Sequence, residues 1–369
     1  MRIAIDVRGL NYKTQTGVGS LTARLISHLP PGHEYYFVGA TPATQTFLLR
    51  LAKAPLQFLS LAQYCGRAHL SSSKAITALS LLRGSINSAQ AMPFDRVLLP
   101  QPKLLPVHPH TKLIAIFHDS FGVRSPMFLT LRQRVVENRR SYKIILDRAD
   151  RVATGSYSAG YDLERYFQVL PTKISLVVPA DVSTGVTAQS GIQLPSNPYF
   201  VAVSGIEPRK NWLNVITGFT LHRRAFPDSH LLLLGKKAAP RYYRRVLKAA
   251  HLAAHCELRE HVGEAEKLAL IQSSQALVYP SFYEGFGFPI LEAHRFGLPV
   301  ITSRVSSMPE VAGDGGVLVN PFDPEEIAAA LSLLRDSPEY HRTLSTYAAR
   351  NYSRFSWDQY QRALAKLLS

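Results

Sequence analysis

The sequence predicts two α/β domains in series, each a parallel sheet covered by helices on both faces. Short apolar segments of strand length alternate with amphipathic helical stretches along most of the chain, the pattern of doubly wound sheets. The length of 369 residues suits two domains. A run rich in Gly, Ser and Pro at residues 181–198 interrupts the alternation and is expected to be the linker. We therefore expect two Rossmann-like domains facing a central cleft.

The first expected domain covers residues 1–185. Its expected strands are residues 2–7, 36–38, 96–99, 113–117 and 151–154. A loop containing Gly9, Gly17 and Gly19 precedes an expected helix at 20–29, and a basic helix is expected at 131–148. Residues 47–61 are apolar with two cations. They predict either an interfacial helix on anionic lipid or a core helix broken at Pro55.

The second expected domain covers residues 196–350. Its expected strands are residues 199–204, 231–234, a segment near 258, 276–279, 300–302 and 317–319. Helices are expected at residues 211–225, 241–255, 264–273, 289–296 and 324–335. The remaining residues, 351–369, are expected to form a helix that crosses back to the first domain. Because doubly wound sheets bind ligands at the carboxyl ends of their strands, functional residues are sought there.

The composition excludes several classes of protein. With 46% hydrophobic and 18% charged residues, the chain is typical of a folded enzyme. Cys65 and Cys256 lie far apart without a CxxC pair, which argues against disulfides or a cysteine-rich zinc site and favours a reducing cytoplasm. The N-terminal apolar run is too short for a signal peptide, and no run reaches the roughly 18 residues of a spanning helix.

The net charge of +16 lies mostly in the first half of the chain. Residues 1–200 contain 22 Lys and Arg against 10 Asp and Glu, whereas residues 201–369 contain 20 against 16. A basic half would attract nucleic acid, an anionic membrane surface or a phosphate-bearing acceptor. No RNP, zinc-finger or helix-turn-helix pattern supports nucleic acid. The basic clusters at 132–151 and 241–248 also fit a solvated surface.

The segment 279–302 contains the strongest candidate site. Glu284 follows an expected strand, and Pro289 opens an expected helix at a position that favours proline. Backbone N–H groups of residues 285–290 at this helix start are expected to bind a diphosphate. Glu284 and Glu292 are separated by seven residues, and both could accept hydrogen bonds from hydroxyls of a sugar and a ribose. Taken singly, a glutamate in such a position is more often a solvated helix residue or a cap.

Two further segments place polar residues after expected strands. Arg209 and Lys210 follow residues 201–203, where they could neutralise a leaving diphosphate or simply form a surface turn. His118 follows residues 113–117 and could bond a substrate hydroxyl as neutral imidazole, or be structural. Gly17 and Gly19 lack the third glycine of a dinucleotide fingerprint but would allow close approach to a ligand.

These motifs together resemble those of the family 4 glycosyltransferases, retaining enzymes of the two-Rossmann GT-B fold. The motifs in the second half are Glu284-Gly-Phe-Gly-Phe-Pro-Ile-Leu-Glu-Ala, Glu207-Pro-Arg-Lys-Asn and the run from Ser306 to Pro321. The first half adds Thr16-Gly-Val-Gly, Phe117-His-Asp-Ser and the run from Arg148 to Ser158. The resemblance covers nearly the whole chain.

The resemblance implies a role for each matching residue. Glu284 would hold hydroxyls of the donor sugar, Glu292 the nucleotide ribose, and Arg209 and Lys210 the diphosphate. His118 would lie near the sugar 6-hydroxyl. Further donor-binding residues would be Gly17, Gly19, Val262, Gly263, Gly285, Phe286, Gly287, Phe288, Ile290 and Leu291. The family generally needs no metal and no cofactor beyond the nucleotide sugar, which agrees with the absence of Asp-x-Asp.

The residues in these motifs are similar to those of bacterial mannosyl- and rhamnosyltransferases of polysaccharide assembly. It implies transfer of a hexose, mannose from GDP-mannose, to a saccharide acceptor linked to polyprenyl diphosphate. A cytoplasmic enzyme docked on the inner face of an anionic membrane is expected. Two alternatives remain, a sugar-nucleotide epimerase of the same fold and a non-enzymatic basic nucleotide- or nucleic-acid-binding protein. Residues 294–295 and 178–182 depart from the family pattern, which leaves the donor open.

Overall fold

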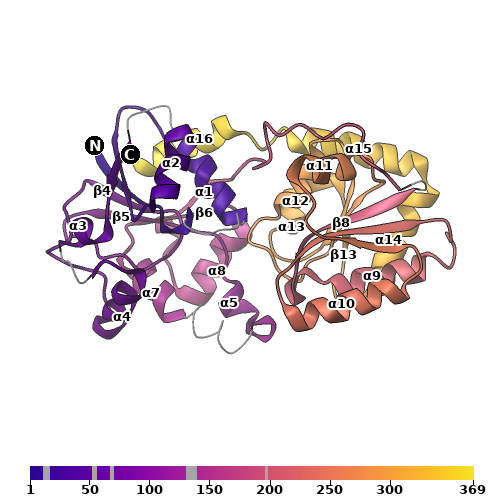
Figure 1. Cartoon of the computed structure of the whole chain (residues 1–369), viewed down its shortest axis with the longest axis horizontal. Helices are drawn as coiled ribbons and strands as arrows, with labels where there is room; N and C mark the ends of the chain where they lie inside the picture. Colours follow the sequence, from indigo (N-terminus) through magenta and orange to yellow (C-terminus); the bar gives the residue numbers. More distant parts are fainter. Residues whose placement is uncertain (11–16, 52–55, 67–69, 130–138, 196–197) are drawn as a thin grey trace. The chain divides into compact units, whose positions relative to one another are not determined.

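The structure is a computed structural model that describes residues 1–10, 17–51, 56–66, 70–129, 139–195 and 198–369. These residues form two compact units, each built on one parallel sheet (Figure 1). The first unit comprises Met1–Val182 and Ser356–Ser369, and the second comprises Ser183–Phe355. Two parallel α/β domains are what the alternating segments predict. The last helix is part of the first unit.

The first unit contains a seven-stranded parallel sheet in the order β3-β2-β1-β4-β5-β6-β7. The chain begins at the centre of the sheet and extends outward in both directions, so the order reverses between β1 and β4. The strands are β1 (Arg2–Asp6), β2 (Glu34–Val38), β3 (Gln57–Leu59), β4 (Arg96–Leu99), β5 (Lys112–Phe117), β6 (Arg151–Thr154) and β7 (Ile174–Leu176).

Helices from both ends of the chain pack in this unit. The described helices are α1 (Gly17–Ser27), α2 (Pro42–Leu51), α3 (Leu61–Cys65), α4 (Ser73–Arg83), α5 (Phe121–Arg124), α7 (Arg139–Arg148), α8 (Tyr157–Phe167) and α16 (Trp357–Leu368). Figure 1 shows the yellow α16 beside the indigo α1. The rings of His28 and Trp357 stack there with centroids 4.8 Å apart. Arg96 of β4 donates hydrogen bonds to the carbonyl oxygens of Leu368 and Ser369. These contacts fasten the C-terminal helix to the first sheet.

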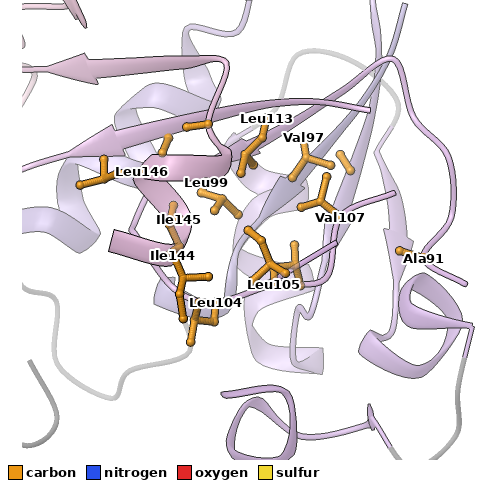
Figure 2. Close-up of a cluster of buried hydrophobic side chains, with 14 of the residues drawn as sticks. Ala91, Val97, Leu99, Leu104, Leu105, Val107, Leu113, Ile144, Ile145 and Leu146 are labelled. Carbon is orange, nitrogen blue, oxygen red and sulfur yellow. The ribbon is translucent and has the colours of Figure 1, made fainter. Parts of the chain in front are cut away.

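The core of the first unit lies between its sheet and its helices (Figure 2). Val97 and Leu99 of β4 and Leu113 of β5 have no exposed surface. Ile145 and Leu146 of α7 pack in the same cluster. All four residues of β4 are buried, because helices cover both faces of a parallel sheet. This burial explains why its strands read as continuous apolar runs.

The second unit contains a six-stranded parallel sheet in the order β10-β9-β8-β11-β12-β13. Its strands are β8 (Tyr199–Ile206), β9 (His230–Lys237), β10 (Cys256–Arg259), β11 (Leu277–Tyr279), β12 (Val300–Ser303) and β13 (Gly316–Val319). Its helices are α9 (Trp212–His222), α10 (Pro240–Leu252), α11 (Glu264–Gln272), α12 (Phe288–His294), α13 (Met308–Ala312), α14 (Pro324–Asp336) and α15 (Pro338–Tyr352). Figure 1 shows α9 and α10 on one face of the sheet and α11, α12 and α15 on the other.

Three expectations for the first unit need correction. The sequence missed β3 and β7, which are three-residue strands at the two edges of the sheet and are only half-buried, so their apolar signal is weak. Residues 47–61 do not form one helix, because α2 ends at Leu51 and residues 57–59 form β3; Pro55 lies outside the described residues. Helix α1 begins at Gly17, so Gly17 and Gly19 lie in its first turn rather than in a loop.

Arginine side chains hydrogen-bond to the linker backbone on each side of the division between Val182 and Ser183. In the first unit, Arg24 donates two hydrogen bonds to the carbonyl oxygen of Val182, at 3.1 and 3.2 Å. In the second, the guanidinium of Arg295 donates to the carbonyl oxygens of Ser183 at 3.2 Å and Val186 at 2.9 Å. Arg295, a departure from the family pattern, therefore has a structural role. Among the described residues, no helix has the length and apolar character needed to cross a membrane.

Candidate active site

The candidate site lies at the carboxyl ends of β8 and β11, which are neighbouring strands of the second sheet. Residues 207–211 connect β8 to α9, and residues 280–287 connect β11 to α12. Because parallel strands end at the same edge of a sheet, these two connections lie next to each other. The backbone N–H of Phe282 donates to the carbonyl oxygen of Arg209 at 2.9 Å and joins them directly.

Glu284 is the centre of a cluster of ionic side chains. Its carboxylate accepts a hydrogen bond from Lys210 Nζ at 2.6 Å and another from Arg209 at 2.9 Å. Arg209 also donates to Glu207 at 2.7 Å, and Lys210 Nζ donates to the hydroxyl of Tyr279 at 2.9 Å. Only 7% of the Glu284 side chain and 11% of the Lys210 side chain are exposed. The residues singled out in two distant segments therefore form one buried cluster.

The local backbone fixes this cluster. Asn211 has a left-handed conformation with φ of 61°, and its side-chain amide donates to the carbonyl oxygens of Pro280 and Pro321 at 2.9 and 2.6 Å. The hydroxyl of Ser307 donates to the carbonyl oxygens of Glu284 and Phe286 at 3.0 and 2.7 Å. Both connections are thus held at several points, which limits the reorganisation that binding a ligand requires.

The electrostatics of the cluster favour an ionised Glu284. Burial alone would raise the pKa of its carboxyl group, but Lys210 and Arg209 outweigh burial and lower this pKa to about 2. Burial and the positive charge of Arg209 lower the pKa of Lys210. Two cations, Arg209 and Lys210, face two carboxylates, Glu207 and Glu284, so their formal charges balance. Any anion that bound to these cations would therefore have to compete with Glu284 for both of them.

Glu292 lies on α12 beside a second lysine. It is 4% exposed, and its Oε2 lies 2.9 Å from Nζ of Lys267 on α11. Lys267 also donates to Glu264 at 2.7 Å. Burial alone would lower the pKa of Lys267, but the charges of Glu292 and Glu264 outweigh it and raise this pKa. The second predicted carboxylate therefore also lies in an ion pair.

The residues between Glu284 and Glu292 differ in how far they are buried. Ile290 and Leu291 have no exposed surface and belong to the core, so their side chains are not available to a ligand. The backbone N–H of Ile290 donates to the carbonyl oxygen of Gly287 at 3.0 Å, which corrects the expectation that it would bind a phosphate. The ring of Phe286 packs against Phe288 at 5.1 Å between centroids. Gly285 is half-buried.

Gly287 is the position where glycine is required. It precedes α12 with φ of 112°, a conformation that other residues rarely adopt. Gly263 differs, because a Cβ there would meet no atom within 4 Å. Val262 and Gly263 lie between β10 and α11, and the α11 residue Lys267 donates its backbone N–H to the carbonyl oxygen of Gly263 at 2.8 Å.

The remaining candidates lie in the first unit. His118 follows β5 and is half-buried, and its Nε2 lies 2.6 Å from the carbonyl oxygen of Pro100. Since a carbonyl only accepts, Nε2 carries the proton, and Nδ1 of the neutral ring is an acceptor suited to a hydroxyl. Burial lowers the pKa of His118 and favours this neutral form. Gly17 is exposed, Gly19 is buried, and Thr16 lies outside the described residues.

Sequence reasoning missed three partners of these residues. Glu207 and Tyr279 bond to Arg209 and Lys210, and Lys267 pairs with Glu292. The sequence did signal two of them, because Glu207 belongs to the motif Glu207-Pro-Arg-Lys-Asn and Tyr279 begins the segment 279–302. Within the described residues, no group of three or more His, Cys, Asp or Glu side chains is placed to hold a metal ion.

The family model and the relatives described below are all glycosyltransferases. The family model described as Glycosyl transferases group 1 matches residues 189–351, which contain the Glu284 cluster. The O-antigen chain mannosyltransferase B of Escherichia coli is 26% identical over 264 residues, which cover 68% of each chain. The O-antigen chain mannosyltransferase RfbU of Salmonella typhimurium is 28% identical over 211 residues, covering 56% of this chain and 57% of that protein.

Solved structures share the fold over both units. HepE of Anabaena, solved with UDP and glucose, has a TM-score of 0.73 at 15% identity, with 100% of this chain and 99% of that chain covered. WaaG, a glycosyltransferase involved in lipopolysaccharide biosynthesis, has a TM-score of 0.66 at 14% identity, with 99% of each chain covered. These neighbours show that the two parallel α/β domains form the GT-B fold that the sequence predicts. The family match over residues 189–351, together with the mannosyltransferase relatives, identifies the protein as a glycosyltransferase.

Proposed function

We propose that the protein transfers mannose from GDP-mannose to a saccharide acceptor in the synthesis of a cell-surface polysaccharide. The observation that carries this proposal is the buried cluster in which Arg209 and Lys210 lie together against Glu284 at the edge of the second sheet. The names of the two relatives that act as O-antigen mannosyltransferases support mannose. HepE was solved with UDP, so the nucleotide base is the first property to test.

The two cations would stabilise the departing diphosphate. When the nucleotide sugar binds, its phosphates would replace Glu284 as partners of Lys210 and Arg209. Glu284, once released from these contacts, could accept hydrogen bonds from hydroxyls of the sugar. In the structure the two cations keep this carboxylate ionised, and an ionised carboxylate is the acceptor that sugar hydroxyls require. The same contacts would thus neutralise the leaving group and position the sugar.

The proposed transfer retains the configuration of the anomeric carbon. The acceptor hydroxyl would attack on the face from which the diphosphate leaves, and Glu284 would position the sugar without becoming a nucleophile. His118 would accept a hydrogen bond from a sugar hydroxyl through Nδ1. We propose a reaction without a metal, because protein cations can supply the charge that the leaving group needs. Glu292 would bind the ribose, with Val262 and Gly263 near the base.

The acceptor is proposed to be linked to a polyprenyl diphosphate at the membrane surface. The excess of positive charge in residues 1–200 supports attraction to an anionic lipid surface. Co-sedimentation with liposomes tests this part. Binding should rise with the fraction of anionic lipid and fall with added salt, and binding that is indifferent to both would contradict peripheral docking.

Calorimetric titration with GDP and UDP, followed by turnover assays, tests the proposal. GDP should bind more tightly than UDP, and GDP-mannose should release GDP only when a saccharide acceptor linked to polyprenyl diphosphate is present. NMR of the product should show an α-linked mannose. Consumption of the donor without any acceptor would favour the epimerase alternative, and binding of neither nucleotide would contradict the proposed function.

A further inference from the structure

The side chain of Lys267 is more buried than is usual for a lysine in a surface ion pair. Only 15% of its side chain is exposed, and it lies between two carboxylates of different exposure. Glu264, on the same helix, is 49% exposed, whereas the Glu292 side chain on α12 is 6% exposed. Burial of a lysine costs free energy, which the two carboxylates offset. Of the two carboxylates, the buried Glu292 is therefore the one that the positive charge of Lys267 stabilises more.

We infer that Lys267 is a positioning residue for the nucleotide: it holds the Glu292 carboxylate ionised and oriented toward the ribose hydroxyls. This inference rests on the proposed function, in which Glu292 binds the ribose. A carboxylate that accepts hydrogen bonds from two hydroxyls must be ionised and fixed in orientation. A buried carboxylate without a nearby cation tends to take up a proton and loses part of its capacity to accept.

The position of Lys267 on α11 supports the same role. It lies in the first turn of the helix, and its backbone N–H bonds to the carbonyl oxygen of Gly263 at 2.8 Å. Val262 and Gly263 are the residues proposed to contact the base. One helical turn would therefore present the base contacts and also the ammonium that orients the ribose carboxylate. An ion pair that only joined α11 to α12 would have no reason to affect ribose recognition.

A pair of nucleotides separates these two roles. GDP and 2′,3′-dideoxy-GDP differ only in the ribose hydroxyls, so the ratio of their dissociation constants reports contacts to those hydroxyls. Calorimetry on the full-length protein measures this ratio without any turnover. Because hydrogen bonds to a charged group are strong, the wild type should prefer GDP by about tenfold or more. In Lys267→Met this preference should fall to less than about threefold, while affinity for the dideoxy nucleotide stays unchanged.

Matched variants complete the test. Lys267→Arg keeps the positive charge and should keep the preference for GDP. Glu264→Gln removes the exposed partner of Lys267 and should also keep it, whereas Glu292→Gln should lose it as Lys267→Met does. If Lys267→Met does not fold, Lys267→Gln, which has no charge, should show the same loss.

Three outcomes would overturn the inference while leaving the proposed function in place. The first is that Lys267→Met binds GDP and the dideoxy nucleotide more weakly by the same factor. The second is that this variant keeps the preference of the wild type for GDP. The third is that the wild type binds both nucleotides equally. A wild type that binds neither GDP nor UDP would instead contradict the proposed function itself. The two failures are therefore distinguishable in one series of titrations.

Discussion

Replacing Glu284 by Gln should strengthen binding of GDP while it abolishes sugar transfer. In the structure, Lys210 Nζ and Arg209 donate to the two carboxylate oxygens of Glu284 at 2.6 and 2.9 Å. In the proposed function the diphosphate must displace both contacts. A hydrogen bond between charged groups contributes about 1.5–3 kcal/mol. Gln keeps a neutral acceptor for one of the two cations. In Glu284→Gln, binding of GDP therefore breaks about one charged hydrogen bond fewer than in the wild type. The dissociation constant of GDP should fall about tenfold.

The assay is calorimetric titration of GDP into the wild type and Glu284→Gln, with turnover of GDP-mannose measured in parallel. Glu339→Gln removes the same charge in the first turn of α15 and controls for the change in net charge. Its GDP affinity should stay within about twofold of the wild type, because distant surface charges are screened. Equal or weaker GDP binding by a folded Glu284→Gln would refute competition between Glu284 and the diphosphate.

Three further predictions concern turnover, acid stability and packing. Lys210→Ala should lower kcat about 100-fold if Lys210 stabilises the leaving diphosphate, and unchanged turnover would remove it from the mechanism. Burial lowers the pKa of His294 to about 4, so the native state binds fewer protons than the unfolded state below pH 6.5 and stability falls as the pH drops toward 4. Urea unfolding of His294→Asn at pH 6.5 and 4.5 should show a pH-dependent loss smaller than that of the wild type by about 2 kcal/mol. Leu364→Ala on α16 should destabilise the first unit by about 2–5 kcal/mol in thermal or urea unfolding, since Leu364 is fully buried, and a loss below 1 kcal/mol would contradict close packing of α16.

Local patterns in the sequence were sufficient for most of the fold. The strands of the second unit lie within a few residues of the expected ranges, because burial on both faces of a parallel sheet leaves continuous apolar runs. The same holds for α9, α10, α11, α12 and α14, whereas α13 and α15 had no expected range. The edge strands β3 and β7 were missed, since each has a neighbouring strand on one side only and is half-buried. The helix start at Gly17 was placed three residues late, because glycine is a poor helix former in general.

The sequence by itself singled out the candidate site residues, because Glu284, Arg209 and Lys210 stand in local motifs after apolar strands. Only the tertiary structure decided how these residues pair. Lys210 and Glu284 are 74 positions apart and meet because β8 and β11 are neighbours in the sheet. Lys267 reaches Glu292 because α11 packs against α12. Periodicity is a local property of the chain, whereas these ion pairs depend on strand order and helix packing, which the whole fold fixes.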